Sequence, residues 1–422
     1  EAVLCNPDGT QQVIYDERSP KYVDHLNKTF YFLEDGRRFI VREETSTGYM
    51  HLYLYGIGQG VLHPITQGEW EVTDFVGLRG DKVYYISTES SPLKRDLYRV
   101  GLDGKHKERL TPGDGYYSIY PSADLSYYIC EGGDSSAPGR TDVFNAAGKR
   151  VRTLYDNAPL KEALAEAGLP VREFFTFTTE RGDELNGYML KPLDFDPAKR
   201  YPVLLTQYSG PGSQQVAEGW GPDWEDALVT HGYIVVCVDP RGTGYRGEEF
   251  KKLTYGNLGR LEVEDQISTA RYMARQSYVD PARIGIYGWS YGGFMALGCA
   301  FRGEGLFKMA IAVAPVTSWR YYDSIYTENF NGLPDDYPKG YDDNSPVNLA
   351  HLFRDDSTRL LIVHGTADDN VHFQNTMEMA RALNKLGKQY DMMVYPDQNH
   401  SMMPDDMIHV REKMLRYTLE NL

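Results

Sequence analysis

Hydrophobic and polar positions follow two different patterns in the two parts of the chain. Through residues 1–156, short aromatic-rich runs alternate with turns that contain Gly, Asp, Asn and Pro; examples are Tyr53–Tyr55, Lys82–Ile86 and Tyr127–Cys130. Short runs bounded by such turn residues are typical of β-strands. We therefore expect the first part of the chain to fold as a series of short strands.

The strand-like runs of the first part recur along the chain. The triplet His51–Tyr53 is followed by Asp96–Tyr98 and Asp142–Phe144, and Pro64–Thr66 by Arg109–Thr111, at a spacing of about 45 residues. Such a period with several strands per repeat is typical of β-propeller blades, and closed propellers have at least about four blades. Because three repeats are visible, we expect the C-terminal blades of an incomplete propeller. A strand meander packed on the second domain is the alternative.

Residues 157–422 change to the pattern of an α/β fold. Pro159–Pro170 is rich in Ala, Glu and Leu and predicts a helical connector. Beyond it, wholly apolar segments alternate with helix-like ones, as expected for a doubly wound, mostly parallel sheet covered on both faces. The predicted strands are Val203–Leu205, Ile234–Val238, Ile284–Tyr287, Met309–Ala314, Leu360–Val363 and Asp391–Tyr395, and the predicted helices are Val263–Gln276, Gly292–Phe301 and Asn375–Leu386.

The run Gly288–Gly292, with the sequence Gly-Trp-Ser-Tyr-Gly, lies between the predicted strand Ile284–Tyr287 and a predicted helix. A G-x-S-x-G run in this position is the nucleophile elbow of an α/β-hydrolase. The two glycines permit a sharp turn that lifts the Ser290 hydroxyl clear of the sheet, where the amides of the helix N-terminus favour developing negative charge. We therefore predict that Ser290 is the nucleophile of a serine hydrolase, the alternative being a structural glycine-rich turn.

A serine nucleophile requires a general base and a carboxylate that orients this base. In α/β-hydrolases the acid and then the histidine follow the serine along the chain. Asp368 lies on the loop after the strand Leu360–Val363, and His400 on the loop after the strand Asp391–Tyr395. Active sites of α/β sheets are built at the carboxyl ends of the strands, so we predict that Asp368 is the acid and His400 the base.

Other residues near these loops compete for the same roles. Asp369 is the alternative acid, whereas His364 and His372 are expected to make structural hydrogen bonds. The cluster of Asp368, Asp369, Asn370 and His372 lacks a recognised metal-ligand spacing. The sequence therefore predicts neither a metal nor another cofactor.

The oxyanion that forms during acyl transfer requires hydrogen-bond donors. The geometry of a nucleophile elbow makes the amide of Tyr291 one such donor. The second donor is expected from the loop after an early strand, Thr206–Gly212, which carries the Tyr208 hydroxyl.

Composition narrows the class of protein. The chain has 422 residues, is 41% hydrophobic and carries a net charge of -16, which argues against nucleic acid or an anionic membrane as partner. No apolar run approaches the ~18 residues that would span a bilayer. Four cysteines are too few for a disulfide scaffold. Cys237 and Cys299 are expected to be buried thiols, and a pairing of Cys5 with Cys130 is left open.

Several longer motifs follow one another in the second part of the chain. In order, they are Asp239–Tyr245, Leu258–Gly259 with Glu262–Gln266, Gly288–Gly293, Ala312–Val316 with Trp319, Tyr321–Ser324, Tyr326–Glu328 and His364–His372. Together they resemble the prolyl oligopeptidase family of serine peptidases, most closely its dipeptidyl peptidase IV group. The resemblance implies an α/β-hydrolase capped by a propeller, with Ser290, Asp368 and His400 as the catalytic triad and Tyr208 and Tyr291 as oxyanion donors.

The resemblance also implies a pocket for a substrate proline. Its lining would be Tyr291, Val316, Trp319, Tyr322, Tyr326 and Val371, with Asn370 reaching a substrate carbonyl. Aromatic faces suit a flat pyrrolidine ring because they bury a large area with little rotamer freedom. The implied function is a serine exopeptidase that releases N-terminal dipeptides after a penultimate Pro or Ala. The alternatives are a tripeptidyl, acylaminoacyl or oligopeptidase relative, a lipase or esterase, and a non-catalytic propeller binding module.

Relatives that release dipeptides hold the free amino terminus of the substrate with paired glutamates on the propeller. The neighbours of the pair Glu43–Glu44 do not match that motif, so we interpret this pair as a solvated turn and expect the amine-binding glutamates upstream of Glu1. The resemblance further implies a homodimer that uses the C-terminal region Pro404–Leu422, and a periplasmic or extracellular location.

Overall fold

The computed structural model describes residues 1–24 and 28–422. Contacts within it group the chain into two compact units. Unit 1 comprises Glu1–Ala167, Ala217–Gly221 and Tyr245–Lys251, and unit 2 comprises Gly168–Val216, Pro222–Gly244 and Lys252–Leu422. Two short segments from the second half of the sequence thus belong to unit 1. The domain boundary after residue 156 stays a prediction.

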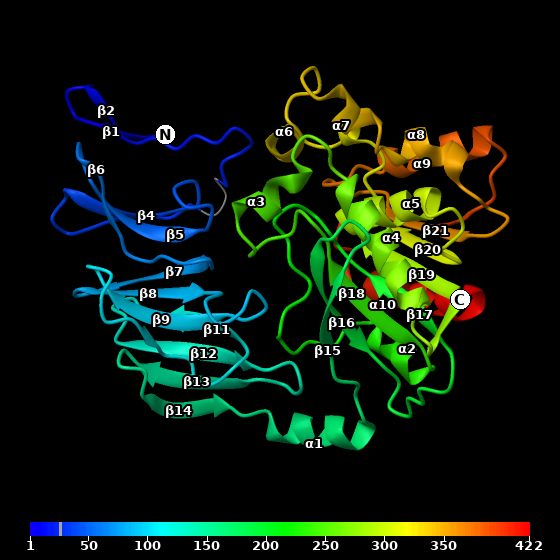
Figure 1. The fold of residues 1–422 in the computed structure, drawn as a ribbon, viewed down its shortest axis with the longest axis horizontal. Coiled ribbons are helices and arrows are strands. Elements are labelled where there is room, and N and C mark those ends of the chain that lie inside the picture. The colour runs from blue at the N-terminus through cyan, green and yellow to red at the C-terminus, as the bar shows by residue number, and fades with distance from the viewer. Residues whose placement is uncertain (25–27) are drawn as a thin grey trace. The chain divides into compact units, whose positions relative to one another are not determined.

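Unit 1 is built mainly from three four-stranded antiparallel sheets (Figure 1). In each sheet, strands that are consecutive in the sequence are neighbours in space. The first sheet contains β3 (Phe30–Phe32), β4 (Arg38–Glu43), β5 (His51–Gly56) and β6 (Gly60–Pro64); the second contains β7 (Val72–Arg79), β8 (Lys82–Ser87), β9 (Asp96–Gly101) and β10 (Glu108–Arg109); the third contains β11 (Tyr116–Pro121), β12 (Tyr127–Gly133), β13 (Arg140–Asn145) and β14 (Arg150–Tyr155). Successive four-stranded antiparallel sheets are the architecture of propeller blades, so the predicted blades are confirmed.

Unit 1 also contains a hairpin and two helices. Strands β1 (Ala2–Cys5) and β2 (Gln11–Tyr15) pair with each other in a separate two-stranded sheet. Helix α1 (Ala158–Ala167) is the helical connector that the sequence predicts, and the short helix α3 (Glu248–Lys251) lies in the last segment of the unit.

The repeat of about 45 residues places equivalent residues at the start of the third strand of each sheet. His51 and Asp96 are the first residues of β5 and β9, and Asp142 is near the start of β13. His51 Nδ1 lies 3.0 Å from Thr66 Oγ1, just after β6. In the second sheet, Thr111 Oγ1 donates to Asp96 Oδ1 at 2.7 Å, just after β10. In these two sheets the repeat therefore encodes a hydrogen bond that closes the outer hairpin.

The core of the first two sheets is continuous. It is formed by the buried residues Leu33, Ile40, Leu52, Leu54, Ile65, Val72, Val83, Tyr85, Tyr98 and Val100. Within it the rings of Tyr85 and Tyr98 stack with centroids 5.7 Å apart. Alternating side chains of each strand point toward the neighbouring sheet, so the blades bury their apolar faces against one another.

The interpretation of Glu43–Glu44 as a solvated turn is wrong, because both residues are only 1% exposed. Glu43, at the end of β4, accepts hydrogen bonds from the hydroxyls of Thr45 and Ser46 at 2.9 and 2.5 Å. Glu44 forms a 2.5 Å ion pair with Lys251 at the end of α3. A charge distant in sequence thus compensates the buried carboxylate, which no local pattern reveals.

Unit 2 contains one eight-stranded sheet in the order β15-β16-β18-β17-β19-β20-β21-β22. Its strands are β15 (Glu173–Thr178), β16 (Glu184–Leu190), β17 (Tyr201–Thr206), β18 (Ile234–Asp239), β19 (Val279–Trp289), β20 (Met309–Val313), β21 (Arg359–Gly365) and β22 (Asp391–Tyr395). The six strands from β17 to β22 are the six predicted ones, and they pair in parallel. Strands β15 and β16, which join antiparallel at one edge, are not among the predicted strands.

Helices follow the parallel strands of this sheet. They are α2 (Asp226–Thr230), α4 (Leu261–Ala274), α5 (Tyr291–Arg302), α6 (Ser324–Asn331), α7 (Pro338–Asp342), α8 (Pro346–Leu349), α9 (Gln374–Lys385) and α10 (Pro404–Asn421), with 3-10 turns at Lys252–Thr254, Trp319–Tyr321 and Ala350–Leu352. Helix α5 packs on β19 and β20, and α2 on β18. The predicted helices correspond to α4, α5 and α9, and the α/β-hydrolase fold is confirmed.

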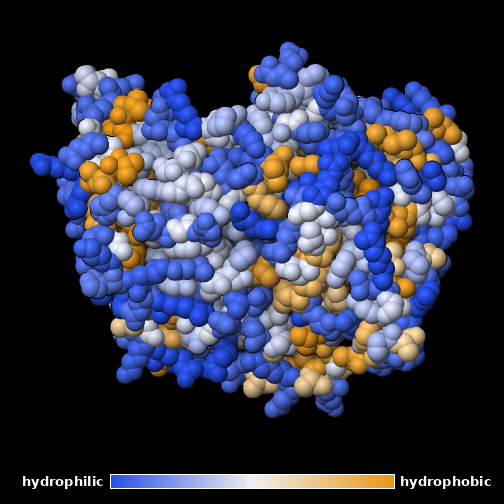
Figure 2. Space-filling model, viewed as in Figure 1, coloured by the Kyte–Doolittle hydropathy of each residue, from blue (hydrophilic) through white to orange (hydrophobic). Residues whose placement is uncertain are grey.

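The surface that Figure 2 shows is mostly hydrophilic and the cysteines are unpaired, as expected from the charged residues and the small number of cysteines in the sequence. Figure 2 shows hydrophilic residues over most of the face in view, with apolar residues in scattered patches. Within residues 1–24 and 28–422, no helix is long and apolar enough to cross a membrane. All four cysteines are free, so the Cys5–Cys130 pairing left open above is not formed. Burial raises the pKa values of the Cys237 and Cys299 thiols, as expected for buried structural cysteines.

Candidate active site

Ser290 occupies the sharp turn between β19 and α5. Its φ of 62° is a left-handed conformation that residues other than glycine rarely adopt. The Ser290 N–H donates to the Val313 carbonyl of β20 at 2.8 Å, and the Ser290 carbonyl accepts from the Phe294 N–H at 3.1 Å. These two bonds hold the strained turn between strand and helix, and the structure thus has the strand-turn-helix arrangement on which the sequence prediction depends.

Close packing explains the glycines on either side of Ser290. A Cβ at Gly288 would lie 2.2 Å from the Gly292 oxygen, and a Cβ at Gly292 would lie 2.5 Å from the Gln207 oxygen. Neither approach is sterically possible without a backbone shift. The elbow therefore requires glycine at both positions because other backbone atoms fill the space of a side chain.

Asp368 and His400 meet at the carboxyl edge of the sheet. The His400 Nδ1–H donates to Asp368 Oδ2 at 2.7 Å. The second oxygen of Asp368 accepts from the N–H groups of Asn370 and Val371 at 3.0 and 2.9 Å. The neighbouring Asp369, the alternative acid, is exposed. Of the two carboxylates, Asp368 is thus the one that contacts the histidine ring.

His364 also contributes to this carboxylate. Its Nε2 lies 3.1 Å from Asp368 Oδ2 and 2.8 Å from the Val371 carbonyl, and its Nδ1 lies 2.7 Å from Thr376 Oγ1. Because both partners of Nε2 are acceptors, Nε2 carries the proton and Nδ1 accepts from the Thr376 hydroxyl. The predicted structural histidine is therefore a second donor to Asp368.

The charge of Asp368 is stabilised in spite of burial. Burial raises the pKa of this carboxyl, but the hydrogen bonds from His364 and His400 outweigh it and hold the pKa well below its usual value. Asp368 is therefore a carboxylate across the physiological range of pH. A carboxylate at Nδ1 fixes the tautomer of His400 and leaves Nε2 unprotonated, as a base requires.

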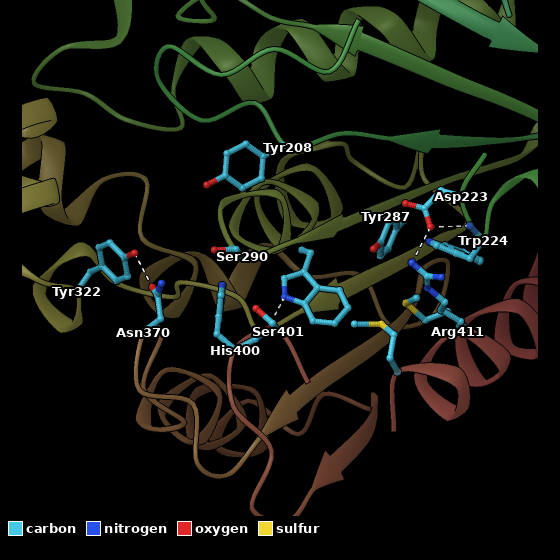
Figure 3. A pocket seen from close by; sticks show the side chains of 13 residues that line it. Tyr208, Asp223, Trp224, Tyr287, Ser290, Tyr322, Asn370, His400, Ser401 and Arg411 are labelled. Carbon is cyan, nitrogen blue, oxygen red and sulfur yellow. Dashed lines mark hydrogen bonds and ion pairs between the residues drawn. The ribbon is translucent and has the colours of Figure 1, made fainter. Parts of the chain in front are cut away.

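The His400 ring lies beside the Ser290 side chain (Figure 3). The loop that carries His400 is tied to the elbow, because the Trp289 indole N–H donates to the His400 carbonyl at 3.1 Å. The serine and the histidine thus come from separate loops that this hydrogen bond connects.

Tyr208 lies on the other side of Ser290 from His400 (Figure 3). Burial raises the pKa of its phenol, and a side-chain hydrogen bond with Ser290 lowers it in part. The adjacent Gln207 donates from Nε2 to the Gly292 carbonyl at 2.9 Å, which ties the Tyr208 loop to the first turn of α5. The Tyr291 N–H belongs to this turn, whose amides have no carbonyl partner within the helix.

An aromatic cluster adjoins the serine. The Tyr291 and Trp319 rings lie 5.4 Å apart, and Trp319 stacks on Tyr326 at 6.1 Å. Tyr322 packs edge-on against Tyr326 at 5.4 Å, and its hydroxyl donates to Asn370 Oδ1 at 2.6 Å. Four residues of the predicted proline pocket therefore form one continuous group of rings.

A buried acid accepts a hydrogen bond from the Tyr291 side chain. Its hydroxyl donates to Glu262 Oε1 at 2.7 Å, and Glu262 Oε2 accepts from the Gly259 N–H at 3.0 Å. Burial raises the pKa of Glu262 to about 7, although these hydrogen bonds lower it in part. The position of the Tyr291 ring thus depends on a carboxyl that lies in the core.

A cavity of about 510 Å³ opens at Ser290. It is lined by Tyr208, Asp223, Trp224, Tyr287, Trp289, Ser290, Tyr322, Asn370, His400, Ser401, Met407, Arg411 and Met414. This lining includes five predicted site residues, which are Tyr208, Ser290, Tyr322, Asn370 and His400. Asp368 is not part of the lining but contacts the His400 ring. The predicted residues Tyr291, Val316, Trp319, Tyr326 and Val371 are buried or half-buried outside it.

Several residues around Ser290 have roles that the sequence does not predict. Gln207 and Glu262 lie within the motifs named above, but a linear motif does not show which side chains its members contact. Asp223, Trp224 and Arg411 lie outside every motif, so no sequence signal pointed to them. Within residues 1–24 and 28–422, no group of His, Cys, Asp or Glu side chains is arranged to hold a metal ion.

Two family models match the chain. The model of the prolyl oligopeptidase family matches residues 220–422, and that of the dipeptidyl peptidase IV N-terminal region matches residues 1–138. Among curated relatives, the probable dipeptidyl-aminopeptidases B of Aspergillus niger and Pyrenophora teres f. teres are 41% and 40% identical over 366 and 367 residues. These matches cover 84% and 85% of the chain, but the chain spans only 40% of each relative.

Solved structures give the same result. The crystal structure of Porphyromonas gingivalis dipeptidyl peptidase 4 matches 100% of this chain and 60% of its own, with 40% identity and a TM-score of 0.95. A putative dipeptidyl aminopeptidase IV from Bacteroides ovatus matches 100% of this chain and 62% of its own, with 28% identity and a TM-score of 0.90. The chain therefore belongs to the prolyl oligopeptidase family, among its dipeptidyl peptidase IV-like members.

Proposed function

We propose that the protein is a serine dipeptidyl peptidase that releases N-terminal dipeptides after a penultimate proline or alanine. The observation that carries the proposal is the convergence of Ser290, His400, buried Asp368 and the Tyr208 hydroxyl at one cavity. The names of the relatives agree with the release of dipeptides.

Catalysis would proceed through an acyl-enzyme. Ser290 Oγ attacks the substrate carbonyl while His400 Nε2 takes the hydroxyl proton, and Asp368 stabilises the resulting imidazolium. His400 then gives this proton to the leaving amine as the peptide bond breaks. In the second half, His400 takes a proton from water, which attacks the ester and regenerates Ser290.

Two donors would stabilise the oxyanion of each tetrahedral intermediate. They are the Tyr208 hydroxyl, from the loop after β17, and the Tyr291 amide, from the first turn of α5. One such donor is worth about 3 kcal/mol of transition-state stabilisation.

The aromatic cluster would select the residue at which acylation occurs. The rings of Tyr291, Trp319, Tyr322 and Tyr326 enclose an apolar surface suited to a pyrrolidine or a methyl side chain. We assign Val316 and Val371 to the same pocket because both are buried beside these segments. Asn370 would contact a substrate carbonyl.

Hydrolysis of a chromogenic Gly-Pro anilide by the full-length protein tests the proposal. We expect turnover that Ser290→Ala lowers by at least about 10⁴-fold, since the nucleophile acts as a unit with its base. Preference for acetylated over free amino termini would instead indicate an acylaminoacyl or oligopeptidase activity. Failure of a fluorophosphonate probe to label Ser290 would indicate a non-catalytic propeller module.

We further propose a homodimer and a periplasmic or extracellular location, on the strength of family membership. Sedimentation of the full-length protein should give the mass of two chains. Cell fractionation should place the activity outside the cytoplasm.

A further inference from the structure

The cavity at Ser290 extends in two directions, and the acyl pocket accounts for only one of them. Figure 3 shows Tyr322 and Asn370 on one side of Ser290 and His400. Asp223, Trp224, Tyr287 and Arg411 lie on the opposite side. The proposed function assigns the first side to the released dipeptide and leaves the second without a role.

The chemistry of the reaction determines what the second side receives. The carbonyl carbon attacked by Ser290 carries the acyl portion on one bond and the leaving nitrogen on another. His400 must protonate that nitrogen, so the leaving peptide passes His400 on the side away from the acyl pocket. That direction leads toward Tyr287 and Arg411.

The walls of this side are apolar. The rings of Trp224 and Tyr287 meet edge-to-face with centroids 5.0 Å apart, and α10, which carries Arg411, also contributes Met407 and Met414 to the lining of the cavity. Trp224 is 8% exposed and Met414 1%. Such walls suit an aliphatic or aromatic side chain directly after the scissile bond, because burial of that side chain is favourable.

The rim of this side carries a cation held in position. Arg411 of α10 forms a 3.1 Å ion pair with Asp223, and about half of each side chain is exposed. Asp223 is itself fixed by the Trp224 N–H at 2.7 Å. A guanidinium has five N–H donors, so an Arg411 oriented by one carboxylate retains donors for a second.

We propose that this side of the cavity is a subsite for the leaving portion of the substrate, in which Arg411 binds the free carboxylate of a short peptide. The preferred substrates are then tri- and tetrapeptides with an apolar residue after the scissile bond. This inference rests on the proposed function and extends it to the length and the C-terminal charge of the substrate.

The test compares Gly-Pro-Leu with Gly-Pro-Leu amide in the full-length protein. The two differ only in the terminal charge. We expect the acid to have a kcat/KM about tenfold above that of the amide, since a charge-assisted hydrogen bond is worth that factor or more. Arg411→Gln should bring this ratio close to one, and Arg411→Lys, which keeps the charge, should leave an intermediate ratio.

The matched control is Arg381→Gln on α9, since the Arg381 side chain is 65% exposed and forms an ion pair with Glu378 of the same helix. It should keep the wild-type ratio. If Arg411→Gln does not change the acid-to-amide ratio of kcat/KM, the proposed subsite is wrong. It is also wrong if the protein prefers Gly-Pro-Arg amide over Gly-Pro-Leu amide, because Asp223 would then be the residue of the rim that binds the substrate. Absence of Gly-Pro anilide turnover by the wild type would overturn the proposed function itself.

Discussion

The Asp368 side chain is fully buried and accepts hydrogen bonds from four donors. Burial and hydrogen bonding have opposite effects on its charge, and this charge determines how His400 can act as a base. A buried carboxylate without partners would take up a proton. The four donors make the charged form the stable one. His400 therefore meets a permanent negative charge, and its protonated form is stabilised when it accepts the serine proton.

Removal of one of these donors tests the balance. His364→Leu deletes the Nε2–H at Asp368, so we expect kcat/KM on a Gly-Pro anilide to fall about tenfold to hundredfold, the equivalent of a lost hydrogen bond to a buried charge. His364→Gln offers a side-chain N–H at similar reach and should recover part of the loss. Equal rates for the leucine variant and the wild type would contradict a role for His364 in holding Asp368.

Tyr208 permits a second test at the scale of one atom. Tyr208→Phe removes only the hydroxyl, so we expect kcat to fall by about 10²–10³ with little change in KM, because an oxyanion donor acts in the transition state. Steady-state kinetics give both constants. A change confined to KM would instead assign Tyr208 to ground-state binding.

At the scale of elements, the β19–α5 turn of unit 2 is enclosed by the backbone of neighbouring segments. The β17 loop, the strand β20 and the first turn of α5 all approach it through backbone atoms. A turn so enclosed can hold a left-handed serine that a freely exposed loop would release.

Gly292→Ala should therefore disrupt this connection, because its Cβ would lie 2.5 Å from the Gln207 oxygen. We expect the free energy of unfolding to fall by about 1–3 kcal/mol or more, as for other overpacked sites, and activity to be lost. Urea unfolding measures the first and anilide hydrolysis the second. Gly221→Ala is the control, since a Cβ there has no atom within 4 Å, and it should change neither quantity.

The elements that the sequence predicts share a clear physical signature. The central residues of strands β17–β21 are apolar and buried because these strands lie inside a covered sheet, and the triplet repeat of unit 1 marks the third strand of each blade. Strand β15 has a mixed pattern because it lies at an edge and is half-exposed, so a search for wholly apolar runs does not find it.

At the scale of the whole molecule, the unpredicted features are contacts between distant segments. Lys251 neutralises Glu44, and Arg411 meets Asp223, yet neither pair is signalled by local spacing. The positions of Ser290, Asp368 and His400 were predictable because α/β folds place catalytic groups at strand ends. The second side of the cavity was not, because it is assembled from a loop and the terminal helix by tertiary packing alone.

Two buried acids are expected to make the free energy of unfolding decrease as pH rises. Burial raises the pKa values of Glu225 and Glu262 from 4.5 to about 7, although the Thr206 and Tyr291 hydroxyls lower them in part. A raised pKa in the folded state means that folding favours the protonated acid. Each acid then contributes stability that is complete below pH 4.5 and is lost as pH rises through about 7. Asp368 is charged in both states over this window and adds no slope.

We therefore expect the free energy of unfolding of the full-length protein to decline between pH 4.5 and 7, by up to about 3 kcal/mol for each acid, since one pKa unit corresponds to about 1.4 kcal/mol. Glu225→Gln removes one titrating group while the Thr206 hydroxyl keeps an acceptor, and it should make the decline less steep. The exposed Glu420 is the control, and Glu420→Gln should leave the slope unchanged. Denaturant unfolding at a series of pH values measures the slope, and a stability that rises over this window in both wild type and Glu225→Gln would mean that these two carboxyls are already ionised in the fold.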